Sequence, residues 1–170
     1  MFGFLGKTKK EYKIGYKLYQ EKRYNEALPH ITYAAEKGYA DAQFLLGDYY
    51  ENINSNEDKD GDKTEMWYER AAAQGHIEAQ YRLGMFYALS WDMLGIALFS
   101  AEKDLKTEDI KTGDTLFDGV FSVLARAAND PKAKLDDIYD ELEIKVKKWL
   151  GEAAKQGHKE AIKEYKRYFG

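Results

Sequence analysis

The stretch AAEKGYADAQFLLGDYY at residues 34–50 recurs as AAAQGHIEAQYRLGMFY at residues 71–87, a step of 37 residues. A shorter fragment, AAKQGHKEA, returns at residues 153–161. Self-similarity at such a period is the sequence signature of repeat proteins, in which each unit buries its apolar face only against its neighbours. Repeat proteins present extended surfaces to partners, so this pattern predicts the class of fold and favours binding over chemistry.

One repeat is predicted to be two antiparallel helices followed by a glycine. Residues 39–52 form the first helix, because small or apolar residues recur at helical spacing, at Ala42, Leu45, Leu46 and Tyr49. Residues 54–61 form a polar loop. Asp62 then caps a second helix over residues 63–74, and Gly75 ends it in the left-handed conformation.

The same pattern extends towards the N-terminus. Residues 12–21 predict a helix with three residues facing inward, Ile14, Gly15 and Leu18. Asn25 can cap a following helix over residues 26–37. Glycine recurs inside the first helix of each pair, at Gly15, Gly47 and Gly84, where a small side chain lets helices approach closely.

The pattern Ala-Ala-x-x-Gly-x-x-x-Ala-Gln-x-x-Leu-Gly-x-x-Tyr resembles the Sel1-like repeat family, a subtype of tetratricopeptide-like α-solenoids. Two near-complete matches carry the resemblance, through Ala34, Ala35, Gly38, Ala42, Gln43, Leu46, Gly47 and Tyr50, and through Ala71, Ala72, Gly75, Ala79, Gln80, Leu83, Gly84 and Tyr87. The resemblance implies an all-α fold, a right-handed α-α superhelix of Sel1-like, tetratricopeptide-like helical hairpins.

In this register residues 1–170 form a single repeat domain. Repeat 1 covers about 9–38, repeat 2 covers 39–75, repeat 3 covers 76–157, and a capping helix covers 158–170. The step from Gly75 to Gly157 is 82 residues, so repeat 3 contains a helical insertion at about 90–137. The insertion, which includes a helix capped by Asp114 and the start of a helix at residues 133–155, either caps the array or binds the partner itself.

Composition excludes several classes of protein. The formal net charge of −4 provides no basic footprint for nucleic acid. The absence of cysteine excludes disulfides and favours a cytoplasmic location. Residues 1–6 are too short for a signal-peptide core, and no stretch is long enough for a membrane span. We expect residues 1–6 to pack as an apolar tail on the first helix, with contact to a membrane surface as the alternative.

No residue pattern indicates catalysis, a cofactor or a metal site. Residues 56–61 imitate the first half of a calcium loop, but Trp67 stands where the bidentate glutamate belongs. His76 and His158 occupy the same repeat position, directly after the glycine, which indicates a packing or capping role for both. Nucleophile, phosphate-loop and His-Glu-x-x-His motifs are absent from the sequence.

In tetratricopeptide-like arrays the first helix of each pair lines a concave face. Transferred through the glycine register, the resemblance places ten residues on that face as partner-binding candidates: Tyr12, Tyr16, Tyr19, Phe44, Leu45, Asp48, Glu51, Tyr81, Arg82 and Met85. Exposed aromatic, Arg and Met side chains suit a protein-binding groove. The competing interpretation is that the insertion fills this groove and some of these residues are core.

The resulting expectation is a non-enzymatic scaffold that binds a protein or peptide on its concave face and its insertion. An alternative is a bacterial immunity protein that neutralises a cognate toxin, since short Sel1-like proteins resemble some of these. A hydrolase-type enzyme is a third possibility, which a pocket joining a histidine to a carboxylate would favour. The sequence leaves open the partner, the pathway and the oligomeric state.

Overall fold

The computed structural model describes residues 2–53, 61–102 and 135–170. Within these ranges all regular secondary structure is helical, which confirms the all-α prediction. The helices are α1 (Phe2–Gln20), α2 (Tyr24–Glu36), α3 (Ala40–Asn52), α4 (Asp62–Ala73), α5 (Ile77–Glu102), α7 (Leu135–Lys155) and α8 (Lys159–Phe169). None of these described helices combines the length and apolarity needed to cross a bilayer.

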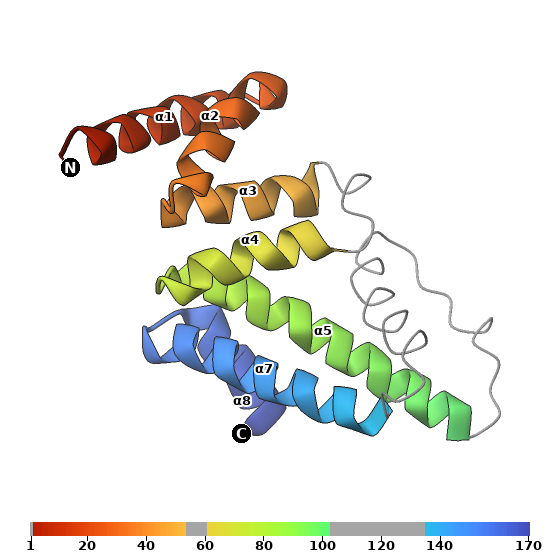
Figure 1. Cartoon of the computed structure of the whole chain (residues 1–170). Coiled ribbons are helices and arrows are strands. Elements are labelled where there is room, and N and C mark those ends of the chain that lie inside the picture. Colours follow the sequence, from red (N-terminus) through yellow and green to blue (C-terminus); the bar gives the residue numbers. More distant parts are fainter. Residues whose placement is uncertain (1, 54–60, 103–134) are drawn as a thin grey trace.

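The helices are stacked in chain order, from α1 and α2 at one end to α7 and α8 at the other (Figure 1). The main contacts join each described helix to the next described one: α1 to α2, α2 to α3, α3 to α4, α4 to α5, α5 to α7 and α7 to α8. The buried side chains form two clusters, one built on Ile31, Leu46 and Trp67 and the other on Tyr68, Leu83 and Leu150. The core therefore extends along the stack.

Glycines inside the first helices allow the close contacts, as the sequence predicts. A Cβ atom on Gly47 would lie 2.6 Å from Cδ1 of the fully buried Tyr68. A Cβ on Gly84 would lie 2.8 Å from Cδ2 of Leu150 and 2.9 Å from its backbone nitrogen. Real Cβ atoms do not approach neighbours this closely, so larger residues at these positions would push the helices apart.

The third helix pair is much longer than the second. Helix α5 has 26 residues and α7 has 21, against 13 in α3 and 12 in α4. At 1.5 Å per residue, α5 is roughly 39 Å long, about twice the length of α3. The predicted insertion thus lengthens the C-terminal end of α5 and the N-terminal end of α7. Its predicted helix at Asp114 lies outside the described residues.

An aromatic cluster packs on the lengthened part of the third pair. The Trp91 ring lies 5.4 Å from Tyr139, 5.8 Å from Tyr168 and 5.8 Å from Phe169, measured between ring centroids. The Tyr168 hydroxyl donates to Oδ2 of Asp92 at 2.7 Å. The C-terminal helix α8 is therefore fixed against both α5 and α7.

Several local predictions were wrong. Helix α1 begins at Phe2 rather than Tyr12, so residues 2–6 continue the helix and are no separate tail. Ile14 is 36% exposed, because the helix turns Gly15 towards Ile31 instead.

Neither predicted N-cap residue serves as one. Arg23 precedes α2, where its carbonyl accepts the N–H of Ala27 at 2.9 Å, and Asn25 is already inside the helix. Gly61 precedes α4 with a φ of 68°, a left-handed conformation that glycine adopts most readily. Asp62 instead occupies the first turn of α4, where its negative charge complements the helix dipole.

Candidate binding face

The predicted partner-binding residues come from α1, α3 and α5, and the surface they form is called the first-helix face below. Tyr16 is the most open tyrosine of this set, with 41% of its surface exposed. The side chain of Arg82 is 38% exposed. Tyr12, Tyr19, Phe44, Tyr81 and Met85 are partly buried. Leu45 is only 6% exposed and belongs to the core with Ile31 and Leu46, so its role is packing.

One ring contact repeats at three joints along this face, where a joint is the connection between one helix pair and the helix that follows it. Tyr12 lies 4.8 Å from Tyr39, Phe44 lies 4.7 Å from His76, and Tyr81 lies 4.4 Å from His158, between ring centroids. The last two pairs are stacked, with interplanar angles of 19° and 23°. In each pair, a ring from one first helix contacts the residue that immediately precedes the next first helix.

The two histidines also cap helices, which confirms the predicted capping role. Nδ1 of His76 accepts the backbone N–H of Ala79, and Nδ1 of His158 accepts that of Ala161, both at 3.1 Å. Because Nδ1 accepts a hydrogen bond, the neutral ring carries its proton on Nε2. Nε2 of His76 lies 3.6 Å from Oδ1 of Asp41, and Nε2 of His158 lies 3.1 Å from Oε2 of Glu78.

The environment of His76 favours its neutral form. Burial lowers the pKa of His76, and this effect outweighs the opposing influence of Asp41 and Glu78. The helix cap also requires the neutral form of His76, because a protonated Nδ1 could not accept the hydrogen bond from the N–H of Ala79. Protonation of His76 is therefore opposed both by burial and by the hydrogen bond at the start of α5.

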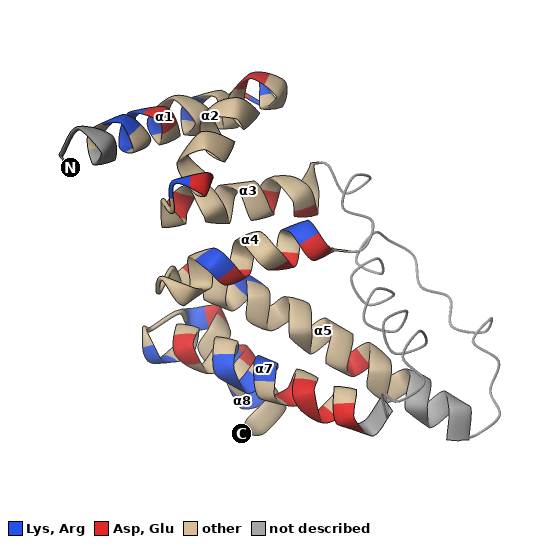
Figure 2. Cartoon of the chain, in the orientation of Figure 1, with Lys and Arg blue, Asp and Glu red and all other residues tan. Residues whose placement is uncertain are grey.

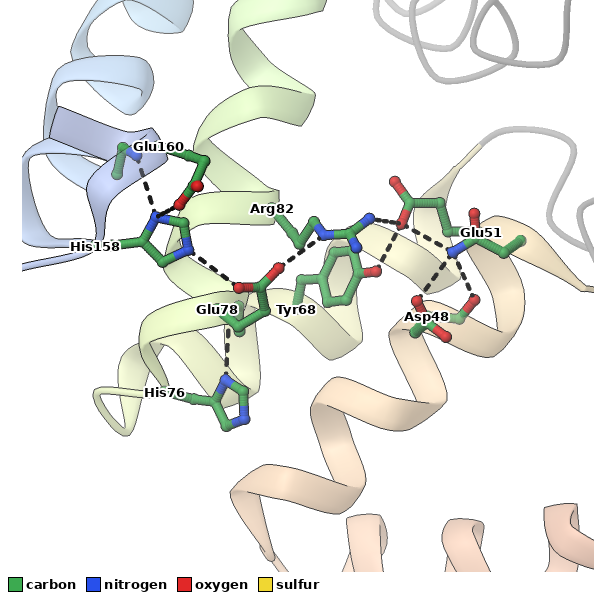
Figure 3. A network of polar contacts seen from close by, with 11 residues as sticks. Asp48, Glu51, Tyr68, His76, Glu78, Arg82, His158 and Glu160 are labelled. Carbon is green, nitrogen blue, oxygen red and sulfur yellow. Dashed lines mark hydrogen bonds and ion pairs between the residues drawn. The ribbon is translucent and has the colours of Figure 1, made fainter. Parts of the chain in front are cut away.

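A network of polar contacts centres on Arg82 (Figure 3). Nε of Arg82 donates to Oε1 of Glu78 at 3.0 Å, and Nη1 donates to Oε2 of Glu51 at 3.3 Å. The same Glu51 oxygen accepts the hydroxyl of Tyr68 at 2.7 Å, and burial with this carboxylate raises the pKa of Tyr68 well above its usual range. Although burial alone raises the pKa of Glu78, the hydrogen bonds from His158 and Arg82 lower it overall.

The network continues to α1 through Asp48. The Tyr19 hydroxyl donates to Oδ2 of Asp48 at 2.5 Å, and Nδ2 of Asn52 donates to Oδ1 at 3.0 Å. Burial and this hydrogen bond to Asp48 raise the pKa of Tyr19. Together with the contacts of Arg82, these bonds join five helices, α1, α3, α4, α5 and the start of α8. The structure therefore brings Tyr19 to Asp48 and Glu51 to Arg82, as members of one network.

A second set of side-chain contacts at the joints was missed by sequence reasoning. Nε2 of Gln43 donates to the carbonyl of Ala35 at 3.1 Å, and Nε2 of Gln80 donates to that of Ala72 at 3.2 Å. Oε1 of Gln43 in turn accepts from Gln74 at 2.7 Å, and Oε1 of Gln80 accepts from Gln156 at 2.6 Å. Gln74 directly precedes Gly75, and Gln156 directly precedes Gly157. This repeated position is the sequence pattern from which the contacts of the two glutamines could have been predicted.

The geometry of the first-helix face suits recognition by contact. It offers aromatic rings, one arginine and several carboxylates that internal bonds already hold in place. In the described ranges, no group of three or more His, Asp or Glu side chains could hold a metal ion. Residues 56–60 of the calcium-loop imitation lie outside those ranges.

Comparison of the chain with models of protein families, with curated proteins and with solved structures gave no match.

Proposed function

We propose that this chain is a non-enzymatic scaffold for protein–protein interaction that binds a protein or peptide on its first-helix face. In this proposal the helix pairs are Sel1-like hairpins wound into a right-handed superhelix, and the insertion in the third pair adds to the binding surface. The partner is another macromolecule, and its bound segment runs along the stack of helices.

The observation that carries the proposal is the row of rings on successive first helices. Tyr16 of α1, Phe44 of α3 and Tyr81 of α5 come from segments far apart in sequence, and each is at least partly accessible. The partly exposed Arg82 accompanies them on α5. Tyrosine and arginine are enriched among the residues that dominate binding energy at protein interfaces.

The polar network supports the proposal through preorganisation. Arg82 is fixed between Glu51 and Glu78, and Glu51 also accepts the Tyr68 hydroxyl. A surface whose long side chains are already ordered loses less conformational entropy when a partner binds. The network therefore supports a rigid recognition surface, on which Asp48, Glu51 and Arg82 are held before the partner arrives.

Affinity capture followed by quantitative binding tests the proposal. The full chain serves as bait, captured proteins are identified by mass spectrometry, and binding of the purified partner is then measured by calorimetry. We expect Tyr16→Ala and Arg82→Ala each to weaken binding by about tenfold or more, the loss typical of an interface anchor. Cross-links should map to α1, α3 and α5.

Ile144→Ala is the matched control, because Ile144 is 66% exposed and belongs to α7, which contributes none of the residues of this face. It should leave the affinity unchanged, and circular dichroism should show all three variants folded. Equal affinity of Tyr16→Ala, Arg82→Ala and the unmodified chain, or cross-links confined to α7 and α8, would contradict the proposal. A captured toxin whose activity the chain blocks would specify the scaffold as an immunity protein.

A further inference from the structure

Two helices from opposite ends of the stack carry opposite charge. Residues 7–17, in α1, contain five lysines and one glutamate, a formal charge of +4. Residues 135–144, the first half of α7, contain five carboxylates and no basic residue, a formal charge of −5. In Figure 2, basic residues recur along α1 and acidic residues dominate the start of α7. Charge asymmetry of this kind indicates an electrostatic partner for each segment.

A row of lysines follows the side of α1 that faces away from the core. Lys10, Lys13 and Lys17 recur at intervals of three and four residues, which places them on one side of the helix. All three are exposed, whereas Gly15, on the opposite side, is buried. Ile14 borders the lysines and is 36% exposed. These three lysines and Ile14 are called the basic stripe below.

The exposed side of α7 carries a row with the same spacing and the opposite charge. This acidic stripe consists of Asp137, Asp140, Glu141 and Ile144. All four residues are exposed, and Ile144, at 66%, is the most exposed large apolar side chain in the described ranges. A partner that covered Ile144 would gain from its burial as well as from the carboxylates beside it.

Most charges of the two stripes have no ion partner in the described part of the chain. Of these residues, Lys17 and Glu141 alone take part in ion pairs there, with Glu21 at 4.0 Å and with Lys145 at 3.1 Å. The side chain of Lys17 is 79% exposed and that of Glu141 is 63% exposed. Exposed ion pairs contribute little and exchange easily, so both stripes remain available to an external partner.

The two stripes complement one another. Each extends over seven helical steps, or about 10 Å of helix, and each combines charges of one sign with an exposed isoleucine. Within one copy the stripes lie apart, because α1 and α7 belong to opposite ends of the stack (Figure 1). The two surfaces can therefore meet only between copies.

We propose that the basic stripe of one copy of this chain docks on the acidic stripe of a second copy. The two stripes are different surfaces, so a copy bound through α1 still presents its own α7 to a third copy, and the chain assembles head to tail. A second copy fits better than nucleic acid, which would engage the lysines and leave the acidic stripe without a role. Neither stripe contains a residue of the first-helix face, so this inference is independent of the partner proposed there.

Sedimentation velocity of the full chain tests this inference. The concentration is raised at low salt to about 1 mM, where even weak protein contacts are populated. We expect the weight-average mass to increase beyond that of a dimer. Added sodium chloride should reverse the increase, because salt screens exposed charges.

Two double variants each remove the charge of one stripe. Lys10→Gln/Lys13→Gln acts on the basic stripe, and Asp137→Asn/Asp140→Asn acts on the acidic stripe. Each variant alone should self-associate about fivefold more weakly or worse, because two exposed charge pairs are lost. A mixture of the two should form a dimer with one copy of each, as tight as the contact between unmodified copies. This dimer should not grow, because its only two intact stripes already face one another.

Two controls separate this contact from general charge effects and from the first-helix face. Lys163→Gln/Lys166→Gln removes two lysines from exposed positions of α8 and should assemble like the unmodified chain. Ile144→Ala should weaken self-association by roughly threefold or more, because less apolar surface is buried. The same variant should keep its affinity for a partner of the first-helix face. Circular dichroism should show every variant folded.

The inference is overturned if the unmodified chain stays monomeric at low salt, or if its mass stops at that of a dimer. It is also overturned if the α8 control weakens assembly as much as the stripe variants do, or if the mixture associates no more tightly than either variant alone. A parallel titration with duplex DNA covers the other occupant. A chain that stays monomeric but binds DNA through Lys10 and Lys13 would assign the basic stripe to nucleic acid instead.

Discussion

The imidazole of His158 stacks on the ring of Tyr81, with the ring centroids 4.4 Å apart. His158 precedes α8 and Tyr81 lies in α5, so the stack connects the last helix to the third pair directly. The same histidine caps α8 through Nδ1 and meets Glu78 through Nε2. One side chain thus combines a ring contact, a helix cap and an ion-pair geometry at a single joint.

Replacing His158 should show how much this joint contributes to stability. We expect His158→Ala to lower the free energy of unfolding by about 1–3 kcal/mol, since it removes the cap and the ring stack together. His158→Asn should recover about 1 kcal/mol of that loss, because asparagine is a good N-cap residue but cannot stack. Urea unfolding followed by circular dichroism measures both, and an alanine variant as stable as the unmodified chain would contradict the role assigned to this joint.

The joint at His76 predicts a dependence of stability on pH. Because burial lowers the pKa of His76 in the folded state, the unfolded chain binds a proton first as the pH falls. This contribution to stability is present above the unfolded pKa of about 6.5 and is lost as the pH falls from there towards the folded pKa. Urea unfolding at a series of pH values from 7.5 downward, taken roughly through the ordinary histidine range, should show the decrease.

The control for this prediction is His76→Asn, which keeps a capping side chain and removes the titrating group. The pH dependence of its unfolding free energy should be shallower between about pH 7 and 5 than that of the unmodified chain. Identical pH profiles for the two proteins would show that His76 does not contribute to the dependence.

Two glycine-to-alanine substitutions should have opposite effects. Gly47→Ala places a Cβ 2.6 Å from the Tyr68 ring, which is fully buried and tied through its hydroxyl to Glu51. We expect a loss of about 1–3 kcal/mol, because neither helix can yield without breaking other contacts. Gly6→Ala meets nothing within 4 Å in α1 and should stabilise the chain by up to about 1 kcal/mol. Thermal unfolding compares them, and a neutral Gly47→Ala would refute the close-approach interpretation.

Sequence reasoning found the parts of the fold that depend on local spacing. The joint glycines Gly75 and Gly157 have φ values of 85° and 88°, and the helices end beside them as predicted. Gly47 and Gly84 lie at the predicted helix contacts. The repeat position shared by His76 and His158 gave their capping role. These features recur at a fixed spacing, so one copy supports the interpretation of the other.

Two other predictions, on the start of α1 and on the exposure of Leu45, were wrong. The first helix was predicted to begin at Tyr12, with residues 1–6 as a separate apolar tail, but α1 begins at Phe2. Leu45 was assigned to the first-helix face through its equivalence to Arg82, but it is buried in the core. The repeat register does not specify how far a helix is rotated at each joint, so equivalent positions can differ in exposure.

The sequence by itself determined the helical composition of the described residues, the joints and the small residues that let helices meet, because helix formation and termination depend on neighbours within a few residues. Only the tertiary structure decided that Arg82 reaches both Glu51 and Glu78, that Tyr19 bonds Asp48, and that the lysines of α1 face away from the core. Those relationships depend on the relative placement of separate helices, which is set by the packing of side chains from distant segments against one another.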